Sequence, residues 1–174
     1  MQESGEQTPF EAVLYTCDTS PCPERAQVIQ DNLKAIGITV VIRRFDRNIQ
    51  FQKEGLRNEP FDLADEGWFA DYADPYDFMN ILLDGKQVTQ PQHNNYAYFN
   101  VAKYNKEMTA ASLLQGPKRG IAYAALDGNM MRTNPPWAPL VNSNDRIFLS
   151  SRVGCVTINE ISATGPLLNV LCLK

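Results

Sequence analysis

The sequence has little of the chemistry on which metal sites and common hydrolases depend. It contains one histidine, His93, so motifs that need two histidine ligands cannot be built. The four cysteines form no C-x-x-C spacing, which argues against a structural zinc site. The glycines form no G-x-G-x-x-G or Walker-type phosphate loop, and no G-x-S-x-G elbow is present. We therefore expect no metal, no cofactor and no catalytic residue.

Long apolar runs and an excess of positive charge are missing as well. No stretch approaches the roughly 20 apolar residues of a membrane span, so we expect no direct membrane insertion of this segment. The formal net charge of −4 argues against nucleic acid as a partner, because nucleic acids select basic surfaces. The polar start lacks the apolar segment of a signal peptide. A hydrophobic content of 44% predicts a globular protein with its own core.

The four cysteines fall into two local sets, and their even number allows three disulfide pairings. The simplest pairing joins neighbours in the sequence, Cys17 with Cys22 and Cys155 with Cys172. Disulfides indicate an oxidising compartment outside the cytoplasm. Four buried or free thiols in a cytosolic protein are the alternative.

A strand, a helix and a second strand are predicted at the start of the chain. Residues 12–15 form a short apolar strand, and residues 38–42 are β-branched throughout, which predicts a buried strand. Between them, Ser20 is expected to cap a helix that Gly37 ends. Apolar residues recur in this helix at helical spacing: Ala26, Ile29, Leu33 and Ile36. The three elements make a βαβ unit with parallel strands.

The rest of the chain predicts alternating helices and strands. Helices are expected over residues 48–56, 75–83, 101–111 and 118–132. Strands are expected over residues 60–64 and 95–100, and a hairpin over 138–149. Residues 86–95 are polar and predict a surface loop with a solvated His93. We interpret residues 1–11 as a polar lead, 12–152 as one α/β unit, and 153–174 as an irregular tail held by its two cysteines.

The stretch 67–78 links the predicted strand 60–64 to the helix 75–83. Ligands of open α/β sheets bind at such turns, which follow the carboxyl ends of strands. Asp74 is expected to cap the helix, and Asp77 to face the positive end of its dipole. Asp71 lies before the cap and has no such structural role. It is the candidate ligand carboxylate, unless it is simply a solvated loop acid.

The motif Trp68-x-x-Asp71-Tyr72-x-Asp74-Pro75 with Phe78 after it resembles a known family. Further landmarks follow the same family order: residues 33–38, Arg119-x-x-x-Tyr123-x-x-Leu126-Asp127, Pro136-x-x-Pro139-Leu140 and Ser151-Arg152-Val153. Together they cover roughly residues 12–155 and resemble the C-terminal lobe of the family 5 extracellular solute-binding proteins. These proteins are the peptide-, nickel- and oligosaccharide-binding components of ABC importers.

The resemblance implies one lobe of a type II periplasmic-binding-protein-like fold, with a mixed, mostly parallel sheet flanked by helices. It implies a longer protein whose second lobe closes with this one on a ligand. It also implies an extracytoplasmic location, with an upstream secretion signal, often a lipid-anchor cysteine, and an ABC permease as partner. A lone lobe offers half of the ligand contacts and is expected to bind in the millimolar range or not at all.

The resemblance assigns roles to residues that match the motif. Asp71 would pair with the α-ammonium of a peptide, Trp68 would line a side-chain or ring pocket, and Tyr72 would form a wall of the cleft. Asn95 and Tyr96, just before the next helix, are weaker candidates. A peptide is the favoured ligand, with an oligosaccharide or a metal chelate as alternatives, because relatives with the same tryptophan bind those.

Two other functions stay open on the residues alone. A small secreted glycoside hydrolase would use Asp71 with a neighbouring acid such as Asp65 or Glu66. A purely structural or partner-docking domain would bury Trp68 and Asp71 against protein and show no response to a ligand. We favour a binding module without catalysis.

Overall fold

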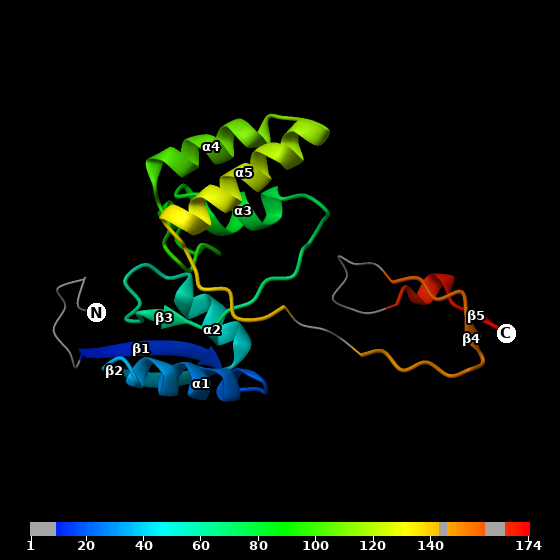
Figure 1. The fold of residues 1–174 in the computed structure, drawn as a ribbon. Coiled ribbons are helices and arrows are strands. Elements are labelled where there is room, and N and C mark those ends of the chain that lie inside the picture. Colours follow the sequence, from blue (N-terminus) through cyan, green and yellow to red (C-terminus); the bar gives the residue numbers. More distant parts are fainter. Residues whose placement is uncertain (1–9, 143–145, 159–165) are drawn as a thin grey trace.

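A parallel three-stranded sheet forms the first part of the structure, a computed structural model that describes residues 10–142, 146–158 and 166–174 (Figure 1). Strand β1 (Phe10–Cys17) pairs along its length with β2 (Ile38–Phe45), and its other edge pairs with β3 (Leu63–Ala64). Helix α1 (Cys22–Lys34) connects β1 to β2. The predicted βαβ unit is confirmed. Most of the predicted polar lead, residues 1–9, lies outside the described residues.

Two local details of this unit differ from expectation. The side chain of Ser20 does not cap α1, because the residue before the helix is Pro21 and no side chain bonds to the free N–H groups there. Strand β2 is not buried throughout, since it lies at the sheet edge and only Val40 is fully enclosed. Gly37 does end the helical segment, and its φ of 88° is a left-handed conformation that favours glycine.

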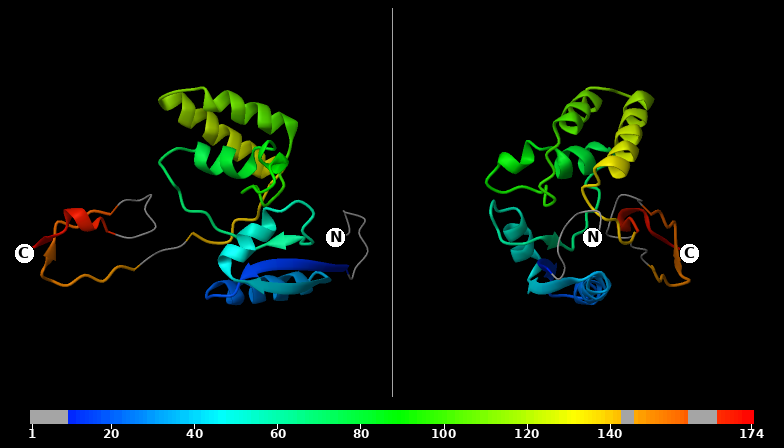
Figure 2. Two further views of the ribbon diagram at one scale, coloured as in Figure 1. Left: turned by 180° about the vertical axis from the view of Figure 1, so that it is seen from behind. Right: turned by 60° about the vertical axis from the view of Figure 1, so that its left-hand side comes forward.

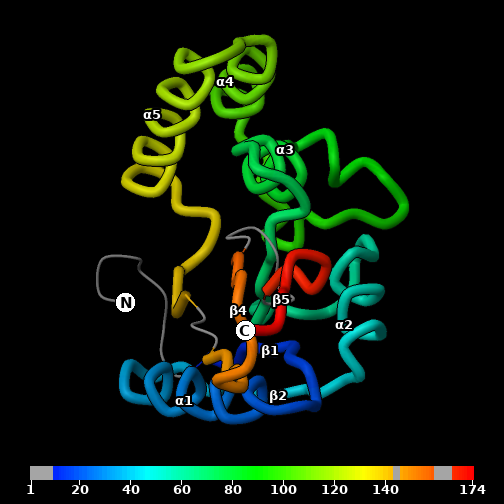
Figure 3. Tube along the Cα trace, turned by 90° about the vertical axis from the view of Figure 1, so that its right-hand side faces the viewer, coloured from blue at the N-terminus to red at the C-terminus, as the bar shows by residue number. Residues whose placement is uncertain are grey.

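Helix α2 (Arg47–Glu54) follows β2 and is capped by Asp46, whose carboxylate accepts the backbone N–H of Asn48 at 2.9 Å. Helices α1 and α2 both contact β1 and β2 and lie on different sides of them (Figure 3). The small core of this part contains Leu14, Ala26 and Val40. Because β3 pairs with β1, the sheet fixes the start of the loop that follows β3.

Three helices form the second part of the structure: α3 (Tyr76–Leu83), α4 (Ala102–Ser112) and α5 (Pro117–Thr133). They lie together and apart from the sheet (Figures 1 and 2). Their core consists of Met79, Leu82, Leu83, Phe99, Tyr104, Met108, Ala111, Tyr123, Leu126 and Met130. Tyrosines and methionines spaced along α4 and α5 thus contribute to one shared core. None of the helices in the described ranges is both long and apolar enough to cross a membrane.

The strand predicted over residues 95–100 does not form. The Asn95 side chain takes its place, because its amide donates to the carbonyls of Asp84 at 3.3 Å and Phe99 at 2.8 Å. Its oxygen accepts the backbone N–H of Phe99 at 3.0 Å. Tyr98, at φ 50°, bends the backbone away from an extended course. A single 3-10 turn, η1 (Gln87–Thr89), is the regular element between α3 and this loop.

The prediction of a solvated His93 is wrong. Its side chain is 5% exposed and meets the ring of Tyr98 edge-on, with 4.8 Å between the ring centroids. The loop reaches this depth because Gly55 has no side chain: a Cβ there would lie 2.8 Å from the His93 carbonyl oxygen. Burial, helped by the charge of Arg57, lowers the pKa of His93.

The described residues of the range 138–149 do not form the predicted hairpin. Neither flank forms a strand, and residues 143–145 of the predicted tip lie outside the described ones. Instead β4 (Val153–Gly154) pairs antiparallel with β5 (Cys172–Leu173) after the turn η2 (Leu168–Val170), so the tail has more regular structure than expected. This segment extends away from both other parts (Figures 1 and 2).

The disulfides are Cys17–Cys22 and Cys155–Cys172. Each joins neighbours in the sequence, which confirms the simplest of the three pairings. The first connects the end of β1 to the start of α1, and the second closes the tail beside the β4–β5 pair.

Candidate functional site

The loop from Asp65 to Pro75 passes from the carboxyl end of β3 to the start of α3, and we call it the site loop (Figure 1). It carries Trp68, Asp71 and Tyr72, so the structure places these three predicted residues in one segment between the sheet and the helices. Trp68 is partly buried and packs against the helical core. This is the position in an open α/β fold at which ligands are bound.

Asp71 and Tyr72 face outward from the site loop. The Asp71 side chain is exposed and accepts no hydrogen bond from any residue that the structure describes. The side chain of Tyr72 is 45% exposed, and Phe69 nearby is 63% exposed. Desolvation, together with the surrounding carboxylates, raises the pKa of the Tyr72 hydroxyl. The same short loop therefore exposes a carboxylate and two aromatic side chains.

Asp77, in the first turn of α3, lies behind the site loop and is 1% exposed. Its Oδ2 accepts the indole Nε1–H of Trp68 and the backbone N–H of Asp71, both at 3.0 Å. The sequence predicts only a favourable position near the helix dipole for this residue. Its contacts to Trp68 and Asp71 depend on the path of the loop, which no local pattern reveals.

Asp74 caps α3 as predicted, because its Oδ1 accepts the backbone N–H of Tyr76 at 2.8 Å. It also forms a bidentate ion pair with Arg119 of α5, with Nη2–Oδ1 at 2.7 Å and Nε–Oδ2 at 2.8 Å. The guanidinium holds the pKa of Asp74 below its usual range. Arg119 further donates to carbonyls at the end of α4, including Ser112 at 2.6 Å. One side chain thus fixes the end of the site loop to two helices.

Asn95 and Tyr96 belong to the loop before α4. Asn95 is fully buried, and its amide is occupied by the loop contacts described above, so its side chain shapes this loop instead of facing solvent. Tyr96 is partly buried and stacks on Phe51 of α2, with 6.1 Å between ring centroids. Burial raises the pKa of Tyr96, and the carboxyls of Glu66 and Glu54 add to this effect. Tyr96 therefore lies near the start of the site loop.

A buried pair of carboxyl groups, Glu54 of α2 and Glu66 of the site loop, was not anticipated from the sequence. Glu54 is fully buried, its carboxyl group faces that of Glu66, and its Oε1 accepts the side-chain amide N–H of Gln50 at 2.9 Å. Burial, and next the neighbouring Glu66 carboxyl, raise the pKa of Glu54 to about 10, so Glu54 keeps its proton at neutral pH. Glu54 Oε2 and Glu66 Oε1 receive no hydrogen bond from any donor among the described residues.

The two acids proposed as hydrolase partners of Asp71 are both engaged elsewhere. Asp65 is buried, forms an ion pair with Arg25 at 3.1 Å and accepts the Thr16 hydroxyl at 3.2 Å. Glu66 is partly buried beside the Glu54 carboxyl, and burial raises its pKa. The described ranges also contain no group of three or more side chains suited to hold a metal ion.

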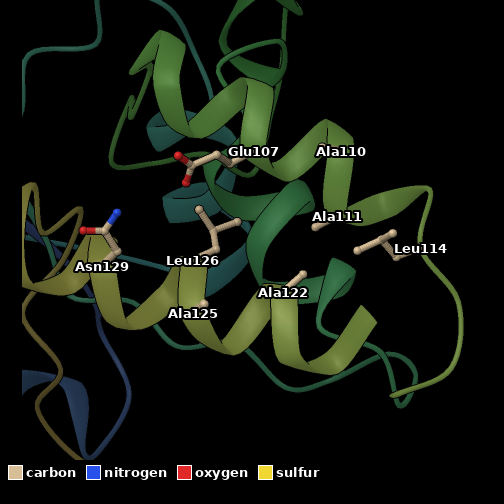
Figure 4. Close-up of a pocket in the computed structure, with 8 residues that line it drawn as sticks. All are labelled: Glu107, Ala110, Ala111, Leu114, Ala122, Ala125, Leu126 and Asn129. Carbon is tan, nitrogen blue, oxygen red and sulfur yellow. The ribbon is translucent and has the colours of Figure 1, made fainter. Parts of the chain in front are cut away.

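Two cavities lie in the helical part. One, of about 390 Å³, lies between α4 and α5 and is lined mostly by alanine and leucine side chains, with Glu107 and Asn129 at one side (Figure 4). It includes no residue of the site loop. The other, of about 340 Å³, borders Pro75 at the end of the loop and is lined by Phe78, Tyr123 and Trp137 among others.

Residues 2–90 match the family described as bacterial extracellular solute-binding proteins, family 5 Middle. The chain belongs to this family. The match includes β1 to α3 and the whole site loop. By its description, this family consists of extracellular solute-binding proteins and not of enzymes. No curated protein sequence matches the chain.

Solved structures show the same fold for this family 5 chain. Clavulanic acid biosynthesis oligopeptide binding protein 2 superposes with a TM-score of 0.83 at 20% identity, over 94% of this chain and 30% of that one. The periplasmic binding protein DppA from Helicobacter pylori, in complex with the peptide STSA, gives a TM-score of 0.72 at 24% identity, over 80% of this chain and 27% of that one.

A dipeptide binding protein from Pseudoalteromonas sp. SM9913, in complex with Met-Leu, gives a TM-score of 0.70 at 19% identity, over 99% of this chain and 34% of that one. The family 5 chain thus spans between 27% and 34% of the length of these three structures. The predicted fold class, one lobe of a periplasmic-binding-protein-like α/β fold, is confirmed.

Proposed function

We propose that this chain is the substrate-binding lobe of an ABC importer solute-binding protein that takes peptides and performs no catalysis. The observation that carries the proposal is the exposed Asp71 carboxylate on the site loop, which accepts no hydrogen bond from a described residue and lies between Trp68 and Tyr72 in the sequence. Solved structures of the same fold hold the peptide STSA and the dipeptide Met-Leu, which supports a peptide as the ligand.

The chemistry of the site loop suits a peptide amino terminus. A fixed carboxylate forms a charge-assisted hydrogen bond with an ammonium group, roughly twice as strong as a neutral one. Aromatic faces beside it add contact area and attract the cation. In this proposal Asp71 binds the α-ammonium, Trp68 and Tyr72 form the walls, and Tyr96 borders the site. Asn95 contributes by keeping the Tyr96 loop in shape.

The mechanism in the longer protein is closure of a cleft. A second lobe contributes the remaining contacts, the ligand stabilises the closed state, and an ABC permease recognises that state. The longer protein lies outside the cytoplasm, where a lipid anchor holds it at the membrane. The two disulfides support this location, because such bonds persist in oxidising compartments. The single lobe binds only weakly.

An NMR titration of the 15N-labelled chain tests the ligand class. Trialanine is added to millimolar concentration while the indole signals of Trp68 and Trp137 are followed. N-acetyl-trialanine, which lacks the ammonium, and maltotriose serve as matched ligands. We expect trialanine alone to move the Trp68 signal, and Asp71→Asn to abolish the movement. Asp18→Asn, which removes the same charge from an exposed position in another loop, should leave it unchanged.

Three results would contradict the proposal. A response to N-acetyl-trialanine as strong as that to trialanine would remove the role of the ammonium. Movement of the Trp137 signal alone would place the site elsewhere in the fold. A response to maltotriose that persists in Asp71→Asn would identify a sugar-binding protein.

A further inference from the structure

One carboxylate oxygen holds two parts of the site loop at once. Asp77 Oδ2 accepts from the Trp68 indole, nine residues before it, and from the Asp71 backbone, six residues before it, at 3.0 Å each. The other oxygen, Oδ1, has no partner among the residues that the structure describes. Asp77 is 1% exposed, so these two bonds form away from solvent. An unbonded carboxylate at this depth would be costly, and the two donors offset that cost.

This arrangement fixes the aromatic wall and the free carboxylate relative to each other. The loop has no regular secondary structure between Ala64 and Tyr76, so ladder or helical bonds do not set its shape. The indole of Trp68 and the peptide group of Asp71 are instead tied to the same atom. A shift of either donor disturbs the bond made by the other.

The shared acceptor stands on a rigid support. Asp77 belongs to α3, whose neighbouring residues Met79 and Leu82 lie in the helical core. The start of α3 is also held by the pair of Asp74 with Arg119 of α5. A functional group positioned by a helix is placed more accurately than one that depends on a loop alone.

We propose that Asp77 is the positioning residue of this site: its Oδ2 sets the Trp68 ring and the Asp71 carboxylate in the arrangement that a ligand meets. Asp77 contacts no ligand itself. Loss of its accepting oxygen disables recognition while every ligand-contacting side chain stays in the chain. The effect on ligand binding rests on the proposed function, whereas the effect on the loop does not.

The first measurement needs no ligand. Hydrogen exchange of the Trp68 indole N–H and the Asp71 amide N–H is followed by NMR in the 15N-labelled chain. Both should exchange more slowly than the indole of Trp137, which is 36% exposed and donates to no described residue. Asp77→Ala should speed both rates by about tenfold or more, because bonds to a charged acceptor are lost. Asp77→Asn keeps an acceptor oxygen and should keep both protected. Asp127→Ala, an exposed aspartate of α5, is the matched control.

The second measurement adds trialanine to the same samples. Asp77→Ala should lose the Trp68 response although Asp71 is present, and Asp77→Asn should retain it. Unchanged exchange at both sites in Asp77→Ala would overturn the proposal, as would equal loss of protection in Asp77→Asn. If Asp77→Ala does not fold, the wild type and Asp77→Asn decide. The proposal is overturned if the Trp68 indole N–H of the wild type exchanges as fast as that of Trp137. It is supported if the Trp68 indole N–H exchanges more slowly and does so in Asp77→Asn as well. Failure of peptide binding with the exchange pattern intact would refute the proposed function alone.

Discussion

The stability of the protein should fall as the pH rises, because Glu54 folds with its proton in place. Its pKa is raised from 4.5 to about 10 by burial and by Glu66. Between these values the folded chain retains a proton that the unfolded chain has released. The contribution of this proton to the free energy of unfolding is therefore complete below about pH 4.5. It is lost progressively as the pH rises toward the pKa of Glu54 in the folded protein.

The magnitude follows from one retained proton. The free energy of unfolding should decrease by up to about 1.4 kcal/mol per pH unit, which amounts to about 2 to 3 kcal/mol between pH 6 and pH 8. That is a large part of the roughly 5 to 15 kcal/mol typical of a folded domain. The charged groups around Glu54 and Glu66 also favour a loss of stability as the pH rises. Asp65 repels the ionised form of both glutamates, and Arg47 attracts that of Glu66 alone.

Urea unfolding at pH 6, 7 and 8, followed by circular dichroism, which reports on the sheet part as well as on the helices, measures the effect. Glu54→Gln replaces the proton donor with an amide that donates to Glu66 at every pH, so its pH dependence should be much flatter. Glu11→Gln, an exposed position on β1, should keep the wild-type slope. Equal slopes for wild type and Glu54→Gln would refute the reasoning and mean that the Glu54–Glu66 pair holds no proton at neutral pH.

Two further predictions concern contacts that join distant segments. Arg119→Met removes the ion pair with Asp74 and should lower the free energy of unfolding at pH 7 by about 1 to 2 kcal/mol. Because the pKa of Asp74 is lowered in the fold, that difference should shrink as the pH falls below 4, and a constant difference would exclude the pair as its source. The double variant Cys155→Ser/Cys172→Ser opens a loop of 17 residues worth about 3 kcal/mol of chain entropy. It should disorder the β4–β5 pair yet leave the Trp68 indole signal in place; a shifted Trp68 signal would show that the tail supports the site.

Patterns that repeat locally predicted much of the fold. The helical spacing of α1, the β-branched run of β2 and Gly37 between them are signals within one element, and they led to the correct βαβ unit. The site loop could also be located, because a strand-like run and a proline-started helix bracket it. The shape of the loop is not encoded in such patterns.

The errors arose where a side chain takes the place of a backbone partner or where distant segments meet. Residues 95–100 look like a strand, but the Asn95 amide satisfies the backbone groups that a neighbouring strand would need. His93 is polar in sequence and buried in space, because Gly55 admits its backbone. The partners Asp74 and Arg119 are 45 residues apart, so no spacing rule connects them.

The division of the interior into two cores that share no residue has a consequence for how the chain opens. We expect each core to support its own cooperative unit, one around the sheet and one around α3 to α5, with the site loop at the boundary between them. Parts of a protein that differ in their free energy of opening can unfold separately. The binding surface is then intact only in molecules that have both units formed. A ligand held by the loop would draw the two units into a single unfolding transition.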